Sequence, residues 1–93
     1  MSLEIRYHEA VVKEDIPCLS GEWKTRIKTA IETRLFSLPD LYGKPLRRSL
    51  KGYRKLRVGD YRVIFRIEEK TVKIFIIGHR SAVYKNAERR LSP

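Results

Sequence analysis

The stretch LRVGDYRVIFRI at residues 56–67 constrains the fold more than any other part of the chain. Apolar and charged residues alternate on both sides of Gly59-Asp60, and this period of two is typical of strands with one buried face. Gly-Asp between two such runs predicts a two-residue hairpin, with Gly at the position that a type II′ turn requires. This turn sets a register in which Val58 faces Tyr61, Arg57 faces Arg62, Leu56 faces Val63 and Lys55 faces Ile64.

The register divides the predicted hairpin into two faces, because residues directly opposite each other lie on the same side of a sheet. Pairing Arg57 with Arg62 is unfavourable unless an anion lies between them, so this pair is a physical indication of a phosphate site. We expect the core face to comprise Leu56, Val58, Tyr61, Val63, Phe65 and Ile67. The opposite face then comprises Tyr53, Lys55, Arg57, Arg62, Ile64 and Arg66.

The other elements follow from similar patterns. Period two predicts a strand at 3–8, and helical spacing predicts helices at 9–19 and 22–36, the first strained by Pro17. Two prolines and a glycine indicate a loop at 38–45. A turn at 68–70 leads into a strand at 71–79, and Ser81 can cap a final helix that runs to about Leu91. The apolar helical positions are Val12, Ile16 and Leu19 in the first helix and Trp23, Ile27, Ala30, Ile31 and Leu35 in the second.

The order β-α-α-β-β-β-α predicts a single α+β domain over residues 1–93, with a small antiparallel sheet and both N-terminal helices on its apolar face. In the last strand, we expect one face to hold Val72, Ile74 and Ile76 and the other to hold Lys73, Phe75, Ile77 and His79. Arg80 has core-face parity if that strand is regular, although it lies at the strand end.

The charge of the chain favours some classes of binding partner over others. The 93 residues carry a net charge of +10, and residues 44–62 hold eight Lys or Arg against Asp60 alone. Such an excess favours nucleic acid as the partner, then an acidic protein, then a membrane surface. Cys18, the single cysteine, excludes a disulfide scaffold and fits a buried position in a cytoplasmic protein. The sequence contains neither a membrane-spanning apolar run nor a signal peptide, so we expect no membrane partner.

The sequence lacks a spaced metal-ligand motif and a glycine-rich phosphate loop, so we expect neither a metal nor a cofactor. The remaining chemistry suits RNA, whose 2′-hydroxyl is a built-in nucleophile that needs alignment, deprotonation and charge stabilisation. Tyr84 offers a ring on which an unstacked base can lie. The candidate catalytic residues are Lys55, Arg62, His79, Arg80 and Tyr84, and the candidate RNA-binding residues are Arg48, Lys51, Arg54, Arg57 and Arg66.

The strings LRVGDYRVIFRI and VKIFIIGHRSAVY resemble the RelE/ParE superfamily of toxins from type II toxin–antitoxin systems, and the RelE branch in particular. The resemblance implies a microbial-RNase-like fold and cleavage of messenger RNA in the ribosomal A site, with a 2′,3′-cyclic phosphate as one product. It also implies an acidic, RelB-like antitoxin. By this resemblance Lys55 activates the 2′-hydroxyl, Arg62 clamps the phosphate, and Tyr84 stacks on a base. The basic residues at Arg57 and Arg80 also match.

One position departs from the pattern. Some RelE-type toxins carry a second lysine two residues before the first, where this chain has Tyr53, and this strengthens His79 as a candidate for proton transfer. The alternative function is that of a ParE-like poison that binds DNA gyrase and cleaves nothing. A third possibility is an RNA-binding module without catalysis.

Overall fold

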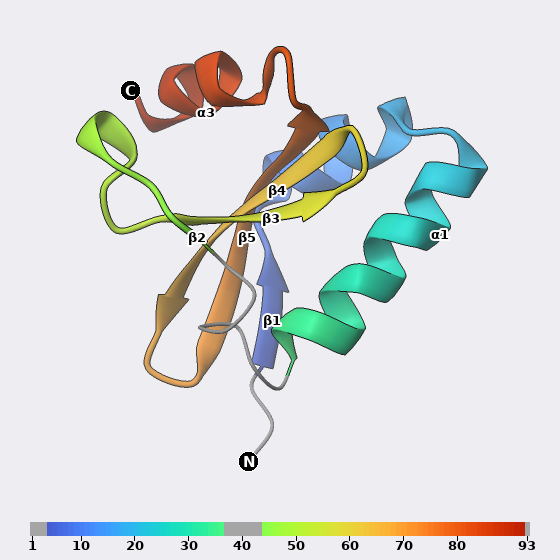
Figure 1. The fold of residues 1–93 in the computed structure, drawn as a ribbon, viewed down its shortest axis with the longest axis horizontal. Coiled ribbons are helices and arrows are strands. Elements are labelled where there is room, and N and C mark those ends of the chain that lie inside the picture. Colours follow the sequence, from blue (N-terminus) through green and yellow to red (C-terminus); the bar gives the residue numbers. More distant parts are fainter. Residues whose placement is uncertain (1–3, 37–43, 93) are drawn as a thin grey trace.

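The computed structural model describes residues 4–36 and 44–92, and these form a five-stranded sheet with helical segments on both faces (Figure 1). The strand order across the sheet is β1-β5-β4-β3-β2. The strands are β1 (Glu4–Tyr7), β2 (Lys44–Pro45), β3 (Arg54–Val58), β4 (Tyr61–Glu68) and β5 (Thr71–His79). The helical segments are η1 (Val11–Asp15), η2 (Ile16–Cys18), α1 (Gly21–Ala30), η3 (Ile31–Leu35), η4 (Arg48–Leu50) and α3 (Val83–Leu91).

The predicted hairpin is confirmed residue by residue. In β3 and β4, Val58 pairs with Tyr61, Arg57 with Arg62, Leu56 with Val63 and Lys55 with Ile64. Gly59 has φ 58°, whereas Asp60 is absent from the described residues with positive φ, as a type II′ turn requires. The α+β class is therefore confirmed together with the register that organises it.

The sheet is mixed, whereas the sequence predicted an antiparallel sheet. The pairs β2–β3, β3–β4 and β4–β5 are antiparallel, but β1 pairs in parallel with β5. Strand β1 forms one edge of the sheet, beside β5. The helical segments follow β1 in the chain, and β2 then forms the opposite edge. Of the predicted loop at 38–45, residues 38–43 lie outside the described residues, and Lys44–Pro45 form the edge strand β2.

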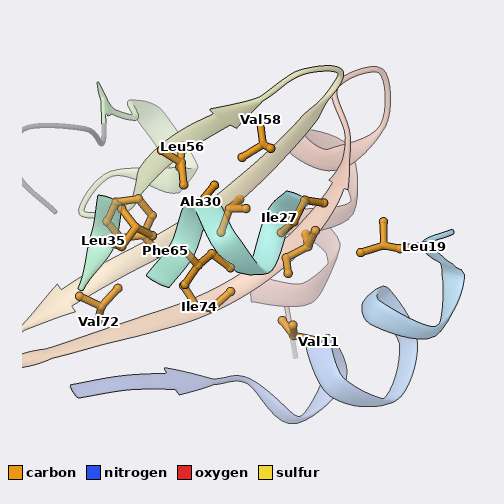
Figure 2. Close-up of a cluster of buried hydrophobic side chains, with 13 residues drawn as sticks. Val11, Leu19, Ile27, Ala30, Leu35, Leu56, Val58, Phe65, Val72 and Ile74 are labelled. Carbon is orange, nitrogen blue, oxygen red and sulfur yellow. The ribbon is translucent and has the colours of Figure 1, made fainter. Parts of the chain in front are cut away.

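The main core lies between the sheet and the helical segments α1 and η3 (Figure 2). Ile27, Ala30, Ile31 and Leu35 are buried, as their helical spacing predicted, and Trp23 packs partly buried against them. From the sheet this core receives Leu56, Val58, Val63, Phe65, Val72, Ile74 and Ile77. Phe65 is fully buried, and truncation of such a side chain to alanine typically costs about 3–5 kcal/mol.

The first predicted helix is shorter and less regular than its pattern indicated. A π-helical turn, η1, passes into the 3₁₀ turn η2, which contains Pro17, because proline cannot donate the hydrogen bond that a continuous helix needs. The change of pitch buries Val11 and leaves Val12 55% exposed, so the predicted core position Val12 was wrong. Cys18 ends the 3₁₀ turn and is exposed, which corrects the expectation that it lies in the core.

A second, smaller core covers part of the opposite face of the sheet. It joins Ile64 and Ile76 from the sheet to Leu50 from η4 and to Val83 and Ala87 from α3. Figure 1 shows α3 and α1 on different sides of the sheet. The face that carries the hairpin cations is therefore covered only in part by α3.

Candidate functional site

The cations of the hairpin lie together on the face opposite α1. Arg57 and Arg62 are direct partners across β3 and β4, and Lys55 lies two residues before Arg57. The Arg62 guanidinium bends back to the turn, where its Nη1 donates to the carbonyl oxygens of Gly59 at 2.8 Å and Tyr61 at 2.9 Å. These hydrogen bonds hold the Arg62 side chain in place beside the exposed Arg57.

Tyr84 completes this face from the far end of the sequence. It is the second residue of α3, and its ring centroid lies 5.5 Å from the Lys55 ammonium nitrogen. Helix α3 approaches the sheet closely because Gly78 lacks a side chain. A Cβ at Gly78 would lie 3.3 Å from both Cβ and Cγ2 of Val83. The structure thus brings together Lys55, Arg57, Arg62 and Tyr84, which we call the basic site.

An irregularity in β5 decides which of His79 and Arg80 shares this face. The register between β4 and β5 shifts between Ile64 and Phe65, so that Ile64 pairs with Ile76 and Phe65 with Ile74. Phe75 is the extra residue of this β-bulge, and both Phe75 and Ile76 pack toward the smaller core. Every residue after the bulge therefore lies on the face opposite to the one that regular alternation predicts.

His79 consequently lies on the face covered by α1 and η3, which corrects the prediction that it belongs with the cations. It pairs with Tyr61, and the two ring centroids lie 5.6 Å apart in an edge-to-face arrangement. The His79 Nδ1 also lies 2.8 Å from Ser81 Oγ. The predicted cap was also wrong, because α3 begins at Val83 without a side-chain cap and Ser81 Oγ contacts His79 instead.

Arg80 lies at the margin of the basic site. Its backbone N–H donates to the carbonyl oxygen of Asp60 at 2.8 Å, and its Nε lies 3.8 Å from the Asp60 carboxylate. These contacts hold Arg80 beside the β3–β4 turn, next to the Arg62–Gly78 pair.

The other candidate RNA-binding residues are spread more widely. Arg48 and Lys51 are exposed around η4, where Ser49 Oγ donates to the Glu88 carboxylate of α3 at 2.7 Å. Arg54 pairs with Phe65, so its position in β3 lies on the face covered by α1 and η3. Arg66 lies on the basic face but further along β4, where it forms an ion pair with Glu68 at 3.1 Å.

The sequence reasoning missed a partly buried ion pair that contacts the bulge. Strand β1 ends at Tyr7, so beyond Ile74 the outer edge of β5 has no neighbouring strand in the described part of the chain. Asp15 of η1 accepts from the N–H of Ile77 at 3.0 Å, and Arg90 of α3 donates to the carbonyl oxygen of Phe75 at 2.9 Å. Two hydrogen bonds of 2.9 and 3.0 Å join Asp15 to Arg90, and the hydrogen bond to Asp15 raises the pKa of the Arg90 guanidinium.

Two further features bear on what the site can hold. A cavity of about 730 Å³ lies along the edge of β5 and is lined in part by His79, Cys18, Asp15 and Arg90, apart from the basic site. Within the described residues, His, Cys, Asp and Glu side chains form no group of three that could hold a metal ion. In this same part of the chain, no helix is long and apolar enough to cross a membrane.

Comparisons with known proteins give a consistent result. A family model described as the ParE toxin of the type II toxin–antitoxin system parDE matches residues 11–84. The chain is 43% identical over 53 residues to Toxin RelE of Mycobacterium tuberculosis, a match covering 55% of each protein. It therefore spans about half the length of the curated relatives it matches.

The fold is similar to solved structures over most of its length. The toxin–antitoxin complex RelBE2 of M. tuberculosis contains a chain that matches with a TM-score of 0.80 and 29% identity, over 86% of this chain and 100% of that one. A double mutant of the E. coli toxin RelE in the free state matches with a TM-score of 0.71 and 23% identity, over 98% and 99% of the two chains. At this identity, the E. coli comparison supports the fold alone.

Proposed function

The chain belongs to the RelE/ParE superfamily of type II toxin–antitoxin toxins, and from this we propose that it is a ribosome-dependent endoribonuclease that cleaves messenger RNA in the A site. The observation that carries the proposal is the basic site, in which a lysine, two arginines and a tyrosine from β3, β4 and α3 meet on one face. Such a set can bind a phosphate, stabilise added negative charge and stack on a base.

In the proposed reaction, the 2′-oxygen of one nucleotide attacks the adjacent phosphorus while the bond from phosphorus to O5′ breaks. The products are a 2′,3′-cyclic phosphate and a 5′-hydroxyl. Lys55 stabilises the charge that develops as the 2′-hydroxyl gives its proton to water, and O5′ takes a proton from water. Arg57 and Arg62 neutralise the phosphate oxygens, and Arg80 binds the flanking phosphate beside the turn.

Tyr84 has two roles in this proposal. Its ring stacks on the base next to the reacting phosphate, and its contact with the Lys55 ammonium, 5.5 Å from the ring centroid, holds that cation in place. His79 is left outside the reacting group, because its ring lies against Tyr61 on the other face.

The proposed partners follow from the family and the charge. A net charge of +10 suits both the ribosome with its message and an acidic, RelB-like antitoxin. The RelBE2 structure is itself a toxin–antitoxin complex, which supports such a partner for this chain. We propose that the protein acts in the cytoplasm, where ribosomes and messages are found.

The second candidate function is inhibition of DNA gyrase without cleavage of RNA. The observation that favours it is the matching family model, which is described as a ParE toxin. The basic site favours the nuclease, because a gyrase poison does not need cations arranged around a reacting phosphate.

A translation reaction with a defined message separates the two candidates. We expect the purified protein to produce new 5′ ends within A-site codons, mapped by primer extension, and to leave gyrase supercoiling unchanged. Inhibited supercoiling without A-site cuts would contradict the nuclease proposal.

Variants then test the site itself. Arg62→Ala and Tyr84→Ala should each slow cutting at least about 100-fold, because each removes a group that contacts the reacting nucleotide. Lys24→Ala removes one cation from the exposed surface of α1 and should cut normally. Circular dichroism checks that all three variants remain folded, and normal cutting by folded Arg62→Ala and Tyr84→Ala would show that the site is misassigned.

A further inference from the structure

A second cavity opens on the same sheet face as the basic site, toward the other end of the strands. Its volume is about 370 Å³, and its lining includes Arg6, His8, Tyr53, Arg66, Lys73 and Phe75. These residues come from β1, the segment after it, the position just before β3, β4 and β5, so the cavity is assembled only when these strands pair. We call it the aromatic pocket.

Three rings form one wall of the aromatic pocket, with Phe75 in contact with each of the other two. The centroids of Tyr53 and Phe75 lie 5.1 Å apart in a tilted arrangement. His8 meets Phe75 edge-on at 5.5 Å, and its Nδ1 accepts the N–H of Ala10 at 3.0 Å, which fixes the ring. Tyr53 and Phe75 are only half-buried, although they lie next to a core that could have covered them.

The bulge in β5 lies within this wall. Phe75 lies two residues after Lys73, so its ring lies on the same side as that of Tyr53, and as the extra residue it has no partner on β4. In a regular strand, Phe75 would keep its side but Ile76 would turn to the other face. The bulge therefore lets Ile76 fill the core beneath while Phe75 faces the cavity.

Cations border the rings. The Arg66 guanidinium lies 5.8 Å from the ring centroid of Tyr53, and Arg6 and Lys73 also line the pocket. Glu68 binds both Lys73 and Arg66, and the hydrogen bond from Lys73 lowers the pKa of the Glu68 carboxyl, with a further contribution from Arg66. Arg6 is paired with Glu4, so the three cations exceed the two carboxylates by one charge.

We propose that the aromatic pocket binds a base of single-stranded RNA, next to the nucleotide held at the basic site. Stacked rings bordered by cations are the arrangement that binds unpaired bases and their phosphates. Tyr53 lies two residues before Lys55 on β3, or about 7 Å at the usual rise of a strand, so one strand of RNA can occupy both sites. This inference rests on the proposed function, since it extends the path of the same RNA.

The position of Tyr53 gives the pocket a particular meaning in this chain. A lysine at this place would offer charge, whereas Tyr53 offers a ring on which a base can stack. The pocket would add affinity for a longer stretch of message without taking part in the reaction.

Binding of uncleavable oligonucleotides tests the proposal on the wild-type protein. The probes are fluorescein-labelled 2′-O-methyl RNAs, namely a trimer, an octamer, and an octamer of the same backbone without bases. By fluorescence anisotropy, the octamer should bind about 10-fold more tightly than the trimer, the gain expected from one added stacked base. The octamer without bases should lose this gain. Equal binding of trimer and octamer, or retention of the gain without bases, would overturn the proposal.

A matched pair of variants locates the gain. Tyr53→Leu with Phe75→Leu removes both rings and keeps apolar volume, and it should reduce octamer binding to the level of the trimer. Phe36→Leu changes an exposed aromatic residue after η3 and should bind as the wild type does. An undiminished gain in the folded double variant would also overturn the proposal.

The same reagents distinguish this proposal from the proposed function. A-site cutting is measured separately by primer extension. If the octamer gain depends on the rings but messages are not cut, the base site stands and the nuclease proposal fails. If messages are cut but the octamer gain is absent, the nuclease proposal stands and the base site fails.

Discussion

Gly59 supports the basic site through a conformation that favours glycine and a contact that leaves no room for a side chain. Its φ of 58° lies in the left-handed region, and a Cβ there would lie 2.6 Å from Cη2 of Trp23. Trp23 in turn packs on Tyr61 at 4.6 Å and carries the Arg26 guanidinium 4.4 Å from its ring centroid. The turn that fixes the register is therefore pressed directly against α1.

Substitution of Gly59 by alanine should lower the free energy of unfolding by about 1–3 kcal/mol, because the new methyl group meets both strain and overpacking. Urea unfolding measures the change. Gly21→Ala is the matched control, since a Cβ there meets nothing within 4 Å and the residue begins α1. Gly21→Ala should leave stability unchanged or slightly raised, and an equally stable Gly59→Ala protein would contradict the contact with Trp23.

Tyr7 gives the fold a dependence on alkaline pH. Partial burial raises the pKa of the Tyr7 phenol above its usual value of 10.0, and the nearby Glu32 carboxylate raises it further. A group whose folded pKa is raised stabilises the fold below its unfolded pKa, and this contribution is lost as the pH rises through the folded pKa.

We therefore expect stability to fall more steeply above about pH 10 in the wild type than in Tyr7→Phe, which has no ionisable phenol. Urea midpoints on either side of that pH measure the slopes, and lysine deprotonation is common to both proteins. Identical slopes would show that Tyr7 ionises equally in the folded and unfolded chains.

Among the elements, β5 has the largest influence on the site. The bulge at Phe75 moves His79 to the face of Tyr61 and assigns Arg80 to the side of Arg62. Asp15 and Arg90 hold this segment by hydrogen bonds to Ile77 and Phe75, with only 10% and 15% of their side-chain surfaces exposed. An ion pair between the first and last helical segments thus maintains the form of a central strand.

Asp15→Ala should destabilise the protein by about 2–4 kcal/mol, because it leaves the Arg90 guanidinium and the Ile77 N–H without their partner. A double-mutant cycle with Arg90→Ala should give a coupling energy above about 1 kcal/mol. The exposed pair Lys13–Glu9 is the control, and its coupling should stay below about 0.5 kcal/mol. Equal coupling in the two cycles would mean that the Asp15–Arg90 pair does not hold the bulge.

At the scale of the whole molecule, the folded chain separates its surfaces by chemistry. Helical segments α1 and η3 cover one face of the sheet over the main core, whereas the other face carries the basic site, the aromatic pocket and α3. The net charge of +10 therefore acts on an anionic partner mainly through one face.

This arrangement predicts the salt dependence of RNA binding. The logarithm of the association constant for the uncleavable octamer should fall linearly with the logarithm of salt concentration. Arg57→Gln should reduce the magnitude of that slope by about 0.7, the contribution of one phosphate contact on a single strand. Lys24→Gln, on α1, should leave the slope unchanged, and an equal reduction in both variants would show that the charge acts without regard to position.

The sequence by itself determined the hairpin, because alternation and a Gly-Asp turn are local properties that one register satisfies. That register placed Lys55, Arg57 and Arg62 on one face, and helical spacing identified the main core of α1 and η3. The family was also readable, since its motifs lie in the same consecutive strands.

Only the tertiary structure decided what happens after Ile74. Ile76 and Ile77 are both apolar, so the sequence fits a regular strand and a bulged strand equally well. The face on which His79 lies in a regular strand is opposite to its face in a bulged strand, and the same holds for Arg80. The choice depends on Asp15 and Arg90, which lie 75 residues apart and meet only when the chain is folded. Alternation along β5 puts Phe75 on the face of Tyr53, but their contact joins β5 to the residue before β3, with β4 between them, and no local pattern encodes that arrangement.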